Sequence, residues 1–335
     1  MRESLTADLR CPVCRRQRTF SLVVDERDER EVRAGELHCG ECGHRARVDR
    51  GIVDLLHEPP PFVTCESAGL QRFVDDAMIP DGWDRARILN LPYEQNGYWF
   101  VQATLMNQTL DETSWRPGAR VLDVGSNTCW AAAMLAEQGY DVVALDITPI
   151  EYQGLGTAEW WMQAKGLYME RVLGVMFDLP FADATFDNIW CSEVLHHNDR
   201  SNLALTFREL HRVLKPHGAV IVNEPLRCLR DLNLHPGKDV AQFEGNEHAY
   251  TRWTFKRLAR KAGFEVEVRP PRLHAAFQPG PITFDDTMSP WTLYRGATAL
   301  ALRGRPRLRN AYLAWLTYVQ GTLLHMVCTK TSASA

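Results

Sequence analysis

The chain lacks the features that would place it in a membrane, in a secreted compartment or on a nucleic acid. No uninterrupted apolar run approaches the ~18 residues of a membrane-spanning helix. The first ten residues, MRESLTADLR, contain no apolar signal region, so a cytoplasmic protein is expected. The net charge of the 335 residues is only −4, and no overall basic excess indicates nucleic-acid binding. Internal repeats and low-complexity tracts are also absent from the sequence.

Cysteine is present in number, with nine residues in the chain. Without a secretion signal, reduced thiols and metal sites are favoured over disulfides. Two Cys-x-x-Cys pairs, Cys11/Cys14 and Cys39/Cys42, lie about 25 residues apart, which is typical of a zinc ribbon. Four thiolates leave Zn²⁺ no open position, so its predicted role is structural, and it would supply the folding free energy of this small segment. Four unligated buried cysteines are the alternative.

The central pattern of the chain is strand, tight turn, helix and strand, from Val121 to Asp146. The first apolar run ends in the turn Gly125–Asn127, and the helical pattern that follows stops at Gly139. The second apolar run ends in Asp146. An acid about 20 residues beyond the turn is typical of a nucleoside-binding βαβ unit, in which it accepts hydrogen bonds from both ribose hydroxyls.

The glycine positions in this turn separate two classes of cofactor. A dinucleotide site needs G-x-G-x-x-G so that the backbone can approach a pyrophosphate. Here the second and third positions are Asn127 and Trp130, which would crowd a phosphate, and the Asp123 carboxylate would repel it. The same carboxylate suits a cofactor that carries an ammonium group and no phosphate. The sequence therefore predicts a site for S-adenosylmethionine.

Further blocks follow in a fixed order, and together they resemble the class I S-adenosylmethionine-dependent methyltransferases of the ubiquinone and menaquinone biosynthesis type. The family's first motif, D/E-x-G-x-G-x-G, corresponds to Asp123–Cys129, where the second and third glycines are replaced. Asp146 corresponds to the ribose-binding acid. The later blocks are Met176–Phe181, Phe186–Cys191, Leu195–His197 ("LHH") and Arg212–Gly218, which resembles "RVLKPGG".

The resemblance implies an α/β fold, a doubly wound, Rossmann-like and mostly parallel seven-stranded sheet, preceded by the small zinc-ribbon domain. The cofactor is then expected at the carboxyl ends of the strands. Asp178 corresponds to the acid that contacts the adenine amino group, although it could instead cap a turn. The residues expected to bind the cofactor are Asp123, Gly125, Asn127, Asp146, Ile147, Asp178 and Leu179.

The N-terminal segment carries a resemblance of its own. Phe20–Val24 is predicted to be a strand and Asp25–Glu31 a charged hairpin loop, and the segment closes with "GIVDLL" at Gly51–Leu56. Together with the four cysteines, this frame resembles the small zinc-ribbon proteins that activate tRNA and rRNA methyltransferases. Members fused to methyltransferases also occur, so the resemblance does not identify the substrate.

Three parts of the chain are predicted, with Pro59–Pro61 as the first break. They are the zinc ribbon (1–58), a linker and helical cover of the cofactor site (59–115) and the methyltransferase domain (116–335). An insertion is expected at about 270–321, with helices at Leu293–Leu302 and Asn310–Gln320. The last strand is predicted at Thr322–Thr329, antiparallel at the edge of the sheet. Tyr93 and Tyr98 either line the cofactor pocket or pack the covering helices onto the sheet.

An oxygen acceptor needs a base to remove its proton. Candidates at the carboxyl ends of the fourth and fifth strands, and in the next loop, are Glu193, His196, His197, Glu224 and His248. Histidine titrates nearest to neutral pH, which favours the three histidines. The alternative is that these residues pack or cap the following helix, and that positioning of the reactants supplies the acceleration.

Three functions are consistent with these patterns. The leading prediction is an enzyme that methylates a small molecule or glycan in a biosynthetic pathway, at oxygen. The second is an RNA-modifying enzyme that uses Arg10, Arg15, Arg16 and Arg18 of the ribbon, although the loop Asp25–Glu31 is acidic. The third is a non-catalytic S-adenosylmethionine-binding protein, which the replaced glycines permit.

Overall fold

The computed structural model describes residues 1–94, 97–113, 115–226, 247–248, 250–269, 304–305, 307–308 and 323–331. Eleven strands form one sheet in the order β1-β2-β3-β4-β7-β6-β5-β8-β9-β11-β10. The predicted helices Leu293–Leu302 and Asn310–Gln320 lie outside the described residues. No helix in the described part of the chain is long and apolar enough to cross a membrane.

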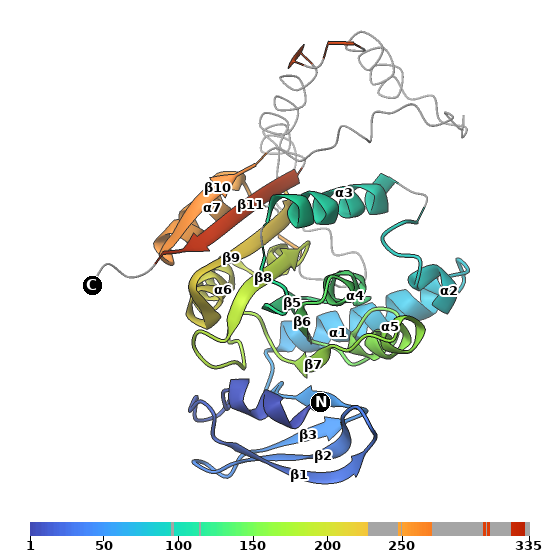
Figure 1. Cartoon of the computed structure of the whole chain (residues 1–335), viewed down its shortest axis with the longest axis vertical. Coiled ribbons are helices and arrows are strands. Elements are labelled where there is room, and N and C mark those ends of the chain that lie inside the picture. The colour runs from blue at the N-terminus through green and yellow to red at the C-terminus, as the bar shows by residue number, and fades with distance from the viewer. Residues whose placement is uncertain are drawn as a thin grey trace.

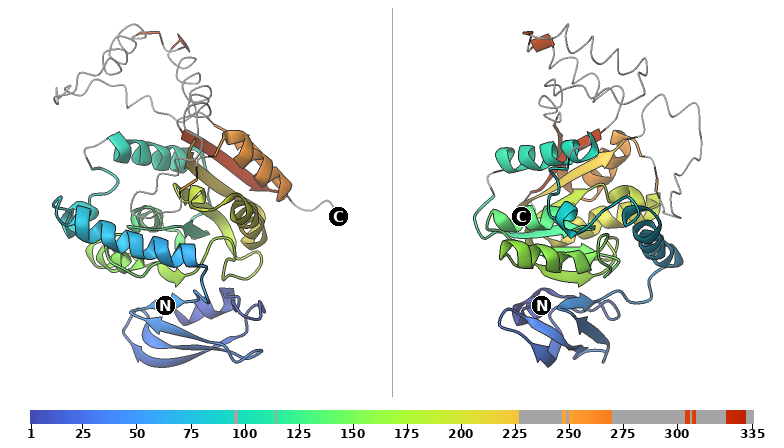
Figure 2. Two further views of the ribbon diagram at one scale, coloured as in Figure 1. Left: turned by 180° about the vertical axis from the view of Figure 1, so that it is seen from behind. Right: turned by 90° about the vertical axis from the view of Figure 1, so that its right-hand side faces the viewer.

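The N-terminal segment folds as the predicted ribbon of antiparallel strands. A short 3-10 helix, Glu3–Asp8, precedes β1 (Phe20–Arg27), β2 (Val32–Cys39), β3 (Arg45–Asp49) and β4 (Ile52–Asp54). The predicted hairpin is confirmed, but β1 runs three residues further than Val24. The ribbon lies at one end of the molecule, opposite β10 and β11 (Figures 1 and 2).

The central sheet has the predicted doubly wound topology. The parallel strands are β5 (Arg120–Val124), β6 (Asp141–Asp146), β7 (Glu170–Leu173), β8 (Phe186–Ser192) and β9 (Leu214–Pro225). Two antiparallel strands, β10 (Phe264–Val268) and β11 (Leu323–Lys330), complete it. The last strand is not at the edge as predicted, because β11 inserts between β9 and β10 and leaves β10 outermost.

The prediction of a seven-stranded sheet is wrong for the molecule as a whole. Strand β4 pairs in parallel with β7, with Val53 opposite Val172. The Leu55 amide extends the contact by donating to the Leu173 carbonyl at 3.1 Å. The four ribbon strands therefore join the seven strands of the central fold. Because the open edge of β7 is covered in this way, the ribbon is a continuation of the sheet.

Helices cover both faces of the sheet, because successive side chains of a strand point to opposite sides. The helices are α1 (Pro61–Phe73), followed by a π-helical turn (Val74–Met78), α2 (Arg85–Ile88), α3 (Gly97–Glu112), α4 (Trp130–Glu137), α5 (Ala158–Lys165), α6 (Arg200–Val213) and α7 (Arg252–Lys261). Leu122 and Val124 of β5 pack with α6 and α7, whereas Val121 packs with α4 and α5. The predicted caps at Thr251 and Gly263 flank α7.

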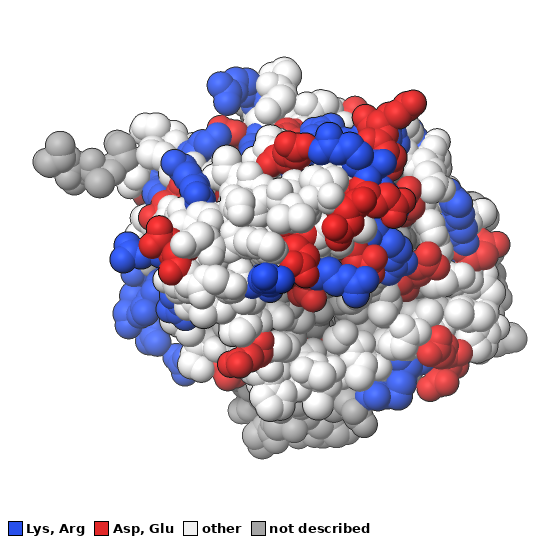
Figure 3. All heavy atoms as spheres, turned by 90° about the horizontal axis from the view of Figure 1, so that it is seen from below, with Lys and Arg blue, Asp and Glu red and all other residues white. Residues whose placement is uncertain are grey.

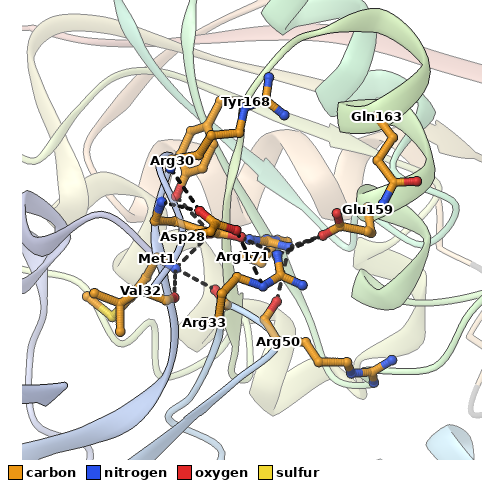
Figure 4. Close-up of polar contacts among 12 residues, drawn as sticks. Met1, Asp28, Arg30, Val32, Arg33, Arg50, Glu159, Gln163, Tyr168 and Arg171 are labelled. Atoms are coloured by element: carbon orange, nitrogen blue, oxygen red, sulfur yellow. Dashed lines mark hydrogen bonds and ion pairs between the residues drawn. The ribbon is translucent and has the colours of Figure 1, made fainter. Parts of the chain in front are cut away.

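A buried ionic network joins the ribbon to the central sheet (Figure 4). Glu31 and Arg171, whose side chains are 2% and 1% exposed, form an ion pair. Arg33 Nη1 contacts Glu31 at 2.6 Å and Glu159 at 3.0 Å, and the Met1 ammonium contacts Glu31 at 2.8 Å. Burial alone would raise the pKa of Glu31, but the charge and hydrogen bond of Arg171 outweigh it and lower this pKa to about 2. The Glu31 carboxylate is therefore ionised and compensated.

Candidate functional site

A cavity of about 440 Å³ opens at the carboxyl ends of β5, β6, β7 and β8. Helix α1 and helix α3 contribute to the opposite wall, through Glu66 and Gln102 among others. This is the place where open α/β sheets bind their ligands. Its volume suits a ligand of nucleoside size.

The turn after β5 keeps the backbone of a glycine-rich loop although the second and third glycines of the motif are replaced. Gly125, Asn127 and Cys129 have φ angles of +68°, +45° and +57°. Asparagine tolerates this left-handed region better than most residues, whereas cysteine adopts it at a cost. A Cβ atom at Gly125 would lie 2.2 Å from a methyl carbon of Val194, so this position also requires glycine for packing. Gly125 and Asn127, which were both predicted to bind the cofactor, line the cavity.

Asp146 lies at the end of β6, and three backbone amides hold its carboxylate. Asn127, Ile147 and Thr148 donate to it at 2.8, 2.7 and 3.2 Å. Burial raises the pKa of Asp146 more than these hydrogen bonds lower it, and the nearby charge of Glu66 adds to the rise, to about 6. Asp146 and Ile147 line the cavity, so the structure places both beside the turn after β5.

Asp123 is a second buried carboxylate at the same end of the sheet. The Ser126 hydroxyl donates to it at 2.6 Å. Burial raises the pKa of Asp123 to about 7, and the charge of Asp146 contributes to this rise. Within the described residues, no lysine or arginine forms an ion pair with Asp123 or Asp146. Two carboxylates without a compensating cation suit a ligand that is itself positively charged.

Two predicted cofactor residues, Asp178 and Leu179, do not line the cavity. Asp178 forms ion pairs with Arg10 and, at 3.2 Å, with Arg15 of the ribbon, while the Leu179 side chain is fully buried in the core. The reason is the position of β7, which ends at Leu173, five residues before Asp178. The chain leaves the strand early, so Val175, Met176 and Phe177 form the cavity wall in their place.

Glu224 and His196, two of the predicted catalytic residues, contact each other away from the cavity lining. One oxygen of Glu224 accepts from the amides of Val194 and Leu195 at 2.9 and 2.7 Å. The other faces His196 Nδ1 at 2.8 Å. Burial would lower the pKa of His196, but the Glu224 carboxylate raises it above its usual value. Glu224 therefore caps the turn that carries His196.

His197 is the predicted histidine that lines the cavity. Its Nδ1 lies 2.5 Å from Glu66 Oε1 on α1. His248 does not line the cavity, and its ring packs near Tyr250 with 6.2 Å between ring centres. The backbone amide of His248 donates to the His196 carbonyl at 2.8 Å, so the segment before α7 lies against the turn after β8.

Glu193, which directly follows β8, is another carboxylate that lines the cavity. Its φ angle is +53°, a strained conformation for a non-glycine residue. Gln102 Nε2 donates to Glu193 at 2.7 Å, and the Tyr98 hydroxyl is a further partner. Burial raises the pKa of Glu193, and the charge of Glu224 adds to the effect. Tyr98 lines the cavity whereas Tyr93 does not.

Sequence analysis did not identify Gln102 or Glu66 as site residues. Both lie on helices that precede the βαβ unit, and no local pattern shows where these helices dock on the sheet. Trp99, Trp130 and Trp190 also line the cavity, with Trp99 and Trp130 in edge-to-face contact at 6.0 Å. Their aromatic spacing in the sequence is equally consistent with an ordinary core.

The four cysteines of the ribbon converge as predicted. The Sγ atoms of Cys11 and Cys42 are 3.7 Å apart, as are those of Cys14 and Cys39. All four sulfur atoms lie within 4.8 Å of one another. A tetrahedron with Zn–S bonds of about 2.3 Å has edges of about 3.8 Å, so the arrangement fits a zinc ion. His38 and His44 are not part of this cluster.

Comparisons with known proteins agree with this geometry. The "Methyltransferase domain" family model matches residues 122–222. The chain is 38% identical to the malonyl-[acyl-carrier protein] O-methyltransferase of Erwinia pyrifoliae over 32% of its own length and 38% of that protein. It is 31% identical to the demethylmenaquinone methyltransferase of Corynebacterium efficiens over 44% of its length and 58% of that protein. The chain thus spans less than two thirds of these curated relatives.

One solved structure is similar over most of the chain. It is a complex between the Haloferax volcanii Trm112 methyltransferase activator and a protein described as a methyltransferase, with a TM-score of 0.52 and 17% identity. The match covers 81% of this chain and 99% of that chain, and it shows a shared fold. Residues 122–222, which match the methyltransferase domain family, supply the cavity walls at the carboxyl ends of β5, β6, β7 and β8.

Proposed function

We propose that the protein transfers the methyl group of S-adenosylmethionine to an oxygen atom of a small molecule or glycan in a biosynthetic pathway. The observation that carries the proposal is the pair of uncompensated carboxylates, Asp123 and Asp146, at the carboxyl ends of adjacent strands in one cavity. S-adenosylmethionine bears a sulfonium, an ammonium and a carboxylate group and no phosphate, so its net charge is positive. Its two cationic groups would offset the negative charge that Asp123 and Asp146 place in a buried site.

The residues around the cavity fit the parts of this ligand. Asp146 is held by backbone amides in an orientation that lets it accept hydrogen bonds from the ribose diol. Asp123 and the backbone at Gly125 suit the methionine moiety. Ile147 and Phe177 provide apolar surface for the adenine ring, and the Phe177 ring packs against Phe62 of α1 at 5.9 Å.

The acceptor side is more polar. S-adenosylmethionine supplies a methyl group that is already activated for in-line displacement, so holding the acceptor in line provides much of the acceleration. Tyr98 and Gln102 orient Glu193, whose raised pKa makes it a suitable receiver of the acceptor's proton. We therefore propose Glu193 as the base, and the predicted role of the histidines stays untested.

The ribbon is proposed to hold one structural zinc ion through Cys11, Cys14, Cys39 and Cys42. Their spacing supports this, because the sulfur atoms already lie at tetrahedral distances. Through β4 the ribbon covers the edge strand β7, whose next residues form a wall of the cavity. In this chain the ribbon therefore supports the cofactor site from within the same polypeptide. Elemental analysis of protein purified without chelator should find one zinc per chain.

The RNA-modifying alternative is not favoured by the charges of the ribbon. Arg10 is buried and pairs with Asp178 and Glu209, and Arg15 also pairs with Asp178. At the end of the molecule that carries the ribbon, Lys and Arg side chains alternate with Asp and Glu (Figure 3). A phosphate backbone is bound best by a surface with an excess of basic groups.

Cofactor binding and methyl transfer are measured separately to test the proposal. Calorimetry should show that the protein binds S-adenosylmethionine and S-adenosylhomocysteine but not NAD⁺. Incubation with S-adenosylmethionine carrying a deuterated methyl group, together with a metabolite extract, should yield a labelled small molecule that mass spectrometry detects. Absence of cofactor binding would contradict the proposal, and binding without any labelled product would favour the non-catalytic alternative.

A further inference from the structure

A second group of metal-ligating side chains lies beside the cavity, apart from the four cysteines. His196, His197 and Glu247 each offer one ligand atom, and these atoms all lie within 4.8 Å of one another. They come from two segments that are distant in the sequence, the turn after β8 and the segment before α7. The hydrogen bond from the His248 amide to the His196 carbonyl, 2.8 Å long, joins these segments.

His196 is oriented by a carboxylate in the way that metal-binding histidines usually are, and a second carboxylate lies beside His197. His196 Nδ1 is hydrogen-bonded to Glu224 at 2.8 Å, and His197 Nδ1 lies 2.5 Å from Glu66, within ion-pair distance. The Glu224 carboxylate keeps the proton of His196 on Nδ1 and leaves the lone pair on Nε2. Glu224 is itself held by the amides of Val194 and Leu195. Such outer partners raise the basicity of the imidazole and fix its ring.

The described residues do not balance the charge around the two imidazoles. Four carboxylates surround them, those of Glu66, Glu193, Glu224 and Glu247. Even two fully protonated histidines would leave an excess of two negative charges. In the described part of the chain, no lysine or arginine forms an ion pair with any of the four. A divalent cation would neutralise this excess.

The distances permit a metal ion after a small adjustment. Metal–nitrogen bonds of about 2.1 Å place two ligand atoms about 3 to 4 Å apart. The two histidine rings are already close, with 4.3 Å between their centres. If the three side chains moved about 1 Å closer together, their ligand atoms would lie at the distances that a bound metal ion requires. Two imidazoles and one carboxylate suit a divalent first-row transition metal and leave further positions open.

From this arrangement we propose that His196, His197 and Glu247 bind a divalent transition-metal ion that ligates the acceptor oxygen. The inference rests on the proposed methyl transfer and narrows its acceptor to a molecule with a hydroxyl or enol oxygen that can reach the metal. His197 lines the cavity and Glu193 lies beside the same turn, so the open coordination positions face the acceptor side.

The chemical step balances with the groups present. A metal ion lowers the pKa of a bound hydroxyl, and the proton passes to the Glu193 carboxylate. A lone pair of the acceptor oxygen then forms the new O–C bond to the methyl group. The S–C bond breaks, and its electron pair stays on sulfur to give neutral S-adenosylhomocysteine. No oxidant or reductant is required.

The test uses the full chain with zinc already in the cysteine site. Cobalt(II) chloride alone is titrated into this protein and followed by calorimetry and visible absorption, while elemental analysis checks that zinc stays at one equivalent. Wild-type protein should bind one equivalent of cobalt without a thiolate charge-transfer band. Loss of a residue that only hydrogen-bonds to a metal ligand weakens metal binding by about 10- to 100-fold. Glu247→Ala and His197→Ala remove ligands themselves, so they should weaken cobalt binding by more than this.

A matched control is His248→Ala, which removes a neighbouring histidine outside the cluster and should leave cobalt affinity unchanged. S-adenosylmethionine affinity, measured in the same samples, should be retained in Glu247→Ala, which also shows that this variant is folded. The inference is overturned if wild-type protein binds no cobalt, if the new absorption is that of thiolate ligands, or if both variants bind as well as wild type. Cobalt binding without cofactor binding would instead contradict the proposed methyl transfer and leave the metal site standing.

Discussion

Glu31 at the ribbon interface and Asp146 in the cavity are both buried carboxylates, but their pKa values move in opposite directions. Burial raises the pKa of both, yet Glu31 ends at about 2 and Asp146 at about 6. The difference is a partner, because Arg171 contacts Glu31 and no described arginine or lysine contacts Asp146. A paired carboxylate stabilises the structure, whereas an unpaired one is a binding site for a cation.

The two regions also differ in how their buried charges are satisfied. The interface around Glu31 uses charges that are satisfied within the protein (Figure 4). The cavity leaves Asp123 and Asp146 dependent on a ligand, so ligand binding should stabilise this region by mass action. Each change of residue or pH that follows acts on either the interface around Glu31 or the cavity.

The largest effect is expected from Arg171→Met, which removes the partner of a buried carboxylate. The variant leaves Glu31 with only Arg33 and the Met1 ammonium as cationic partners, and it should lower the free energy of unfolding by about 3 kcal/mol, measured by chemical denaturation at neutral pH. Arg47→Met is the control, because Arg47 and Asp49 form an exposed pair at 3.9 Å that should contribute little. Equal losses in the two variants would refute a special role for the buried pair.

Acid should reach the interface only after it has protonated the cavity carboxylates, because the pKa of Glu31 is the lower one. A carboxylate with a depressed pKa contributes stability above its unfolded value of about 4.5, and this is lost as the pH falls toward about 2. The stability of the wild type should therefore drop by about 3 kcal/mol more than that of Glu31→Gln across this window. Parallel denaturation series from pH 5 to about 2 measure the difference, and identical slopes would contradict the assignment.

On the cavity side, Asp146→Ala should weaken S-adenosylmethionine binding and spare the fold. Loss of charge-assisted hydrogen bonds costs about 1.5–3 kcal/mol, or one to two decades in affinity by calorimetry. Asp178→Ala is an informative control, because Asp178 pairs with Arg10 outside the cavity. The Asp178→Ala variant should bind the cofactor as tightly as the wild type. A loss of affinity as large as that of Asp146→Ala would support the adenine-binding role that was predicted from the sequence.

The smallest effect is the pH dependence of cofactor binding. Asp146 must be ionised to accept the ribose hydroxyls, and its pKa in the free protein is raised to about 6. Affinity should begin to fall as the pH drops through about 7, where Asp123 titrates, and should fall further by up to about tenfold for each unit below pH 6. Glu31 remains ionised there, so the interface stays intact. Asp146→Asn should show a flatter profile in the same titration.

The sequence by itself determined the local chemistry of the protein. The four cysteines, the acid that ends β6 and the cap at Thr251 each act within a few residues of where the pattern occurs. The order of the central strands follows from apolar runs separated by turns and helices. The left-handed turn at Gly125 and Asn127 was likewise predictable, because the motif's remaining glycine marks it.

Only the tertiary structure decided which side chains meet across the chain. Asp178 faces the ribbon because β7 ends at Leu173, and a strand's end depends on its neighbours in the sheet. Glu224 caps the turn at His196 because β8 and β9 lie side by side, which no local pattern shows. Contacts between distant segments depend on strand length and register, and these are set by packing of the whole sheet and not by neighbouring residues.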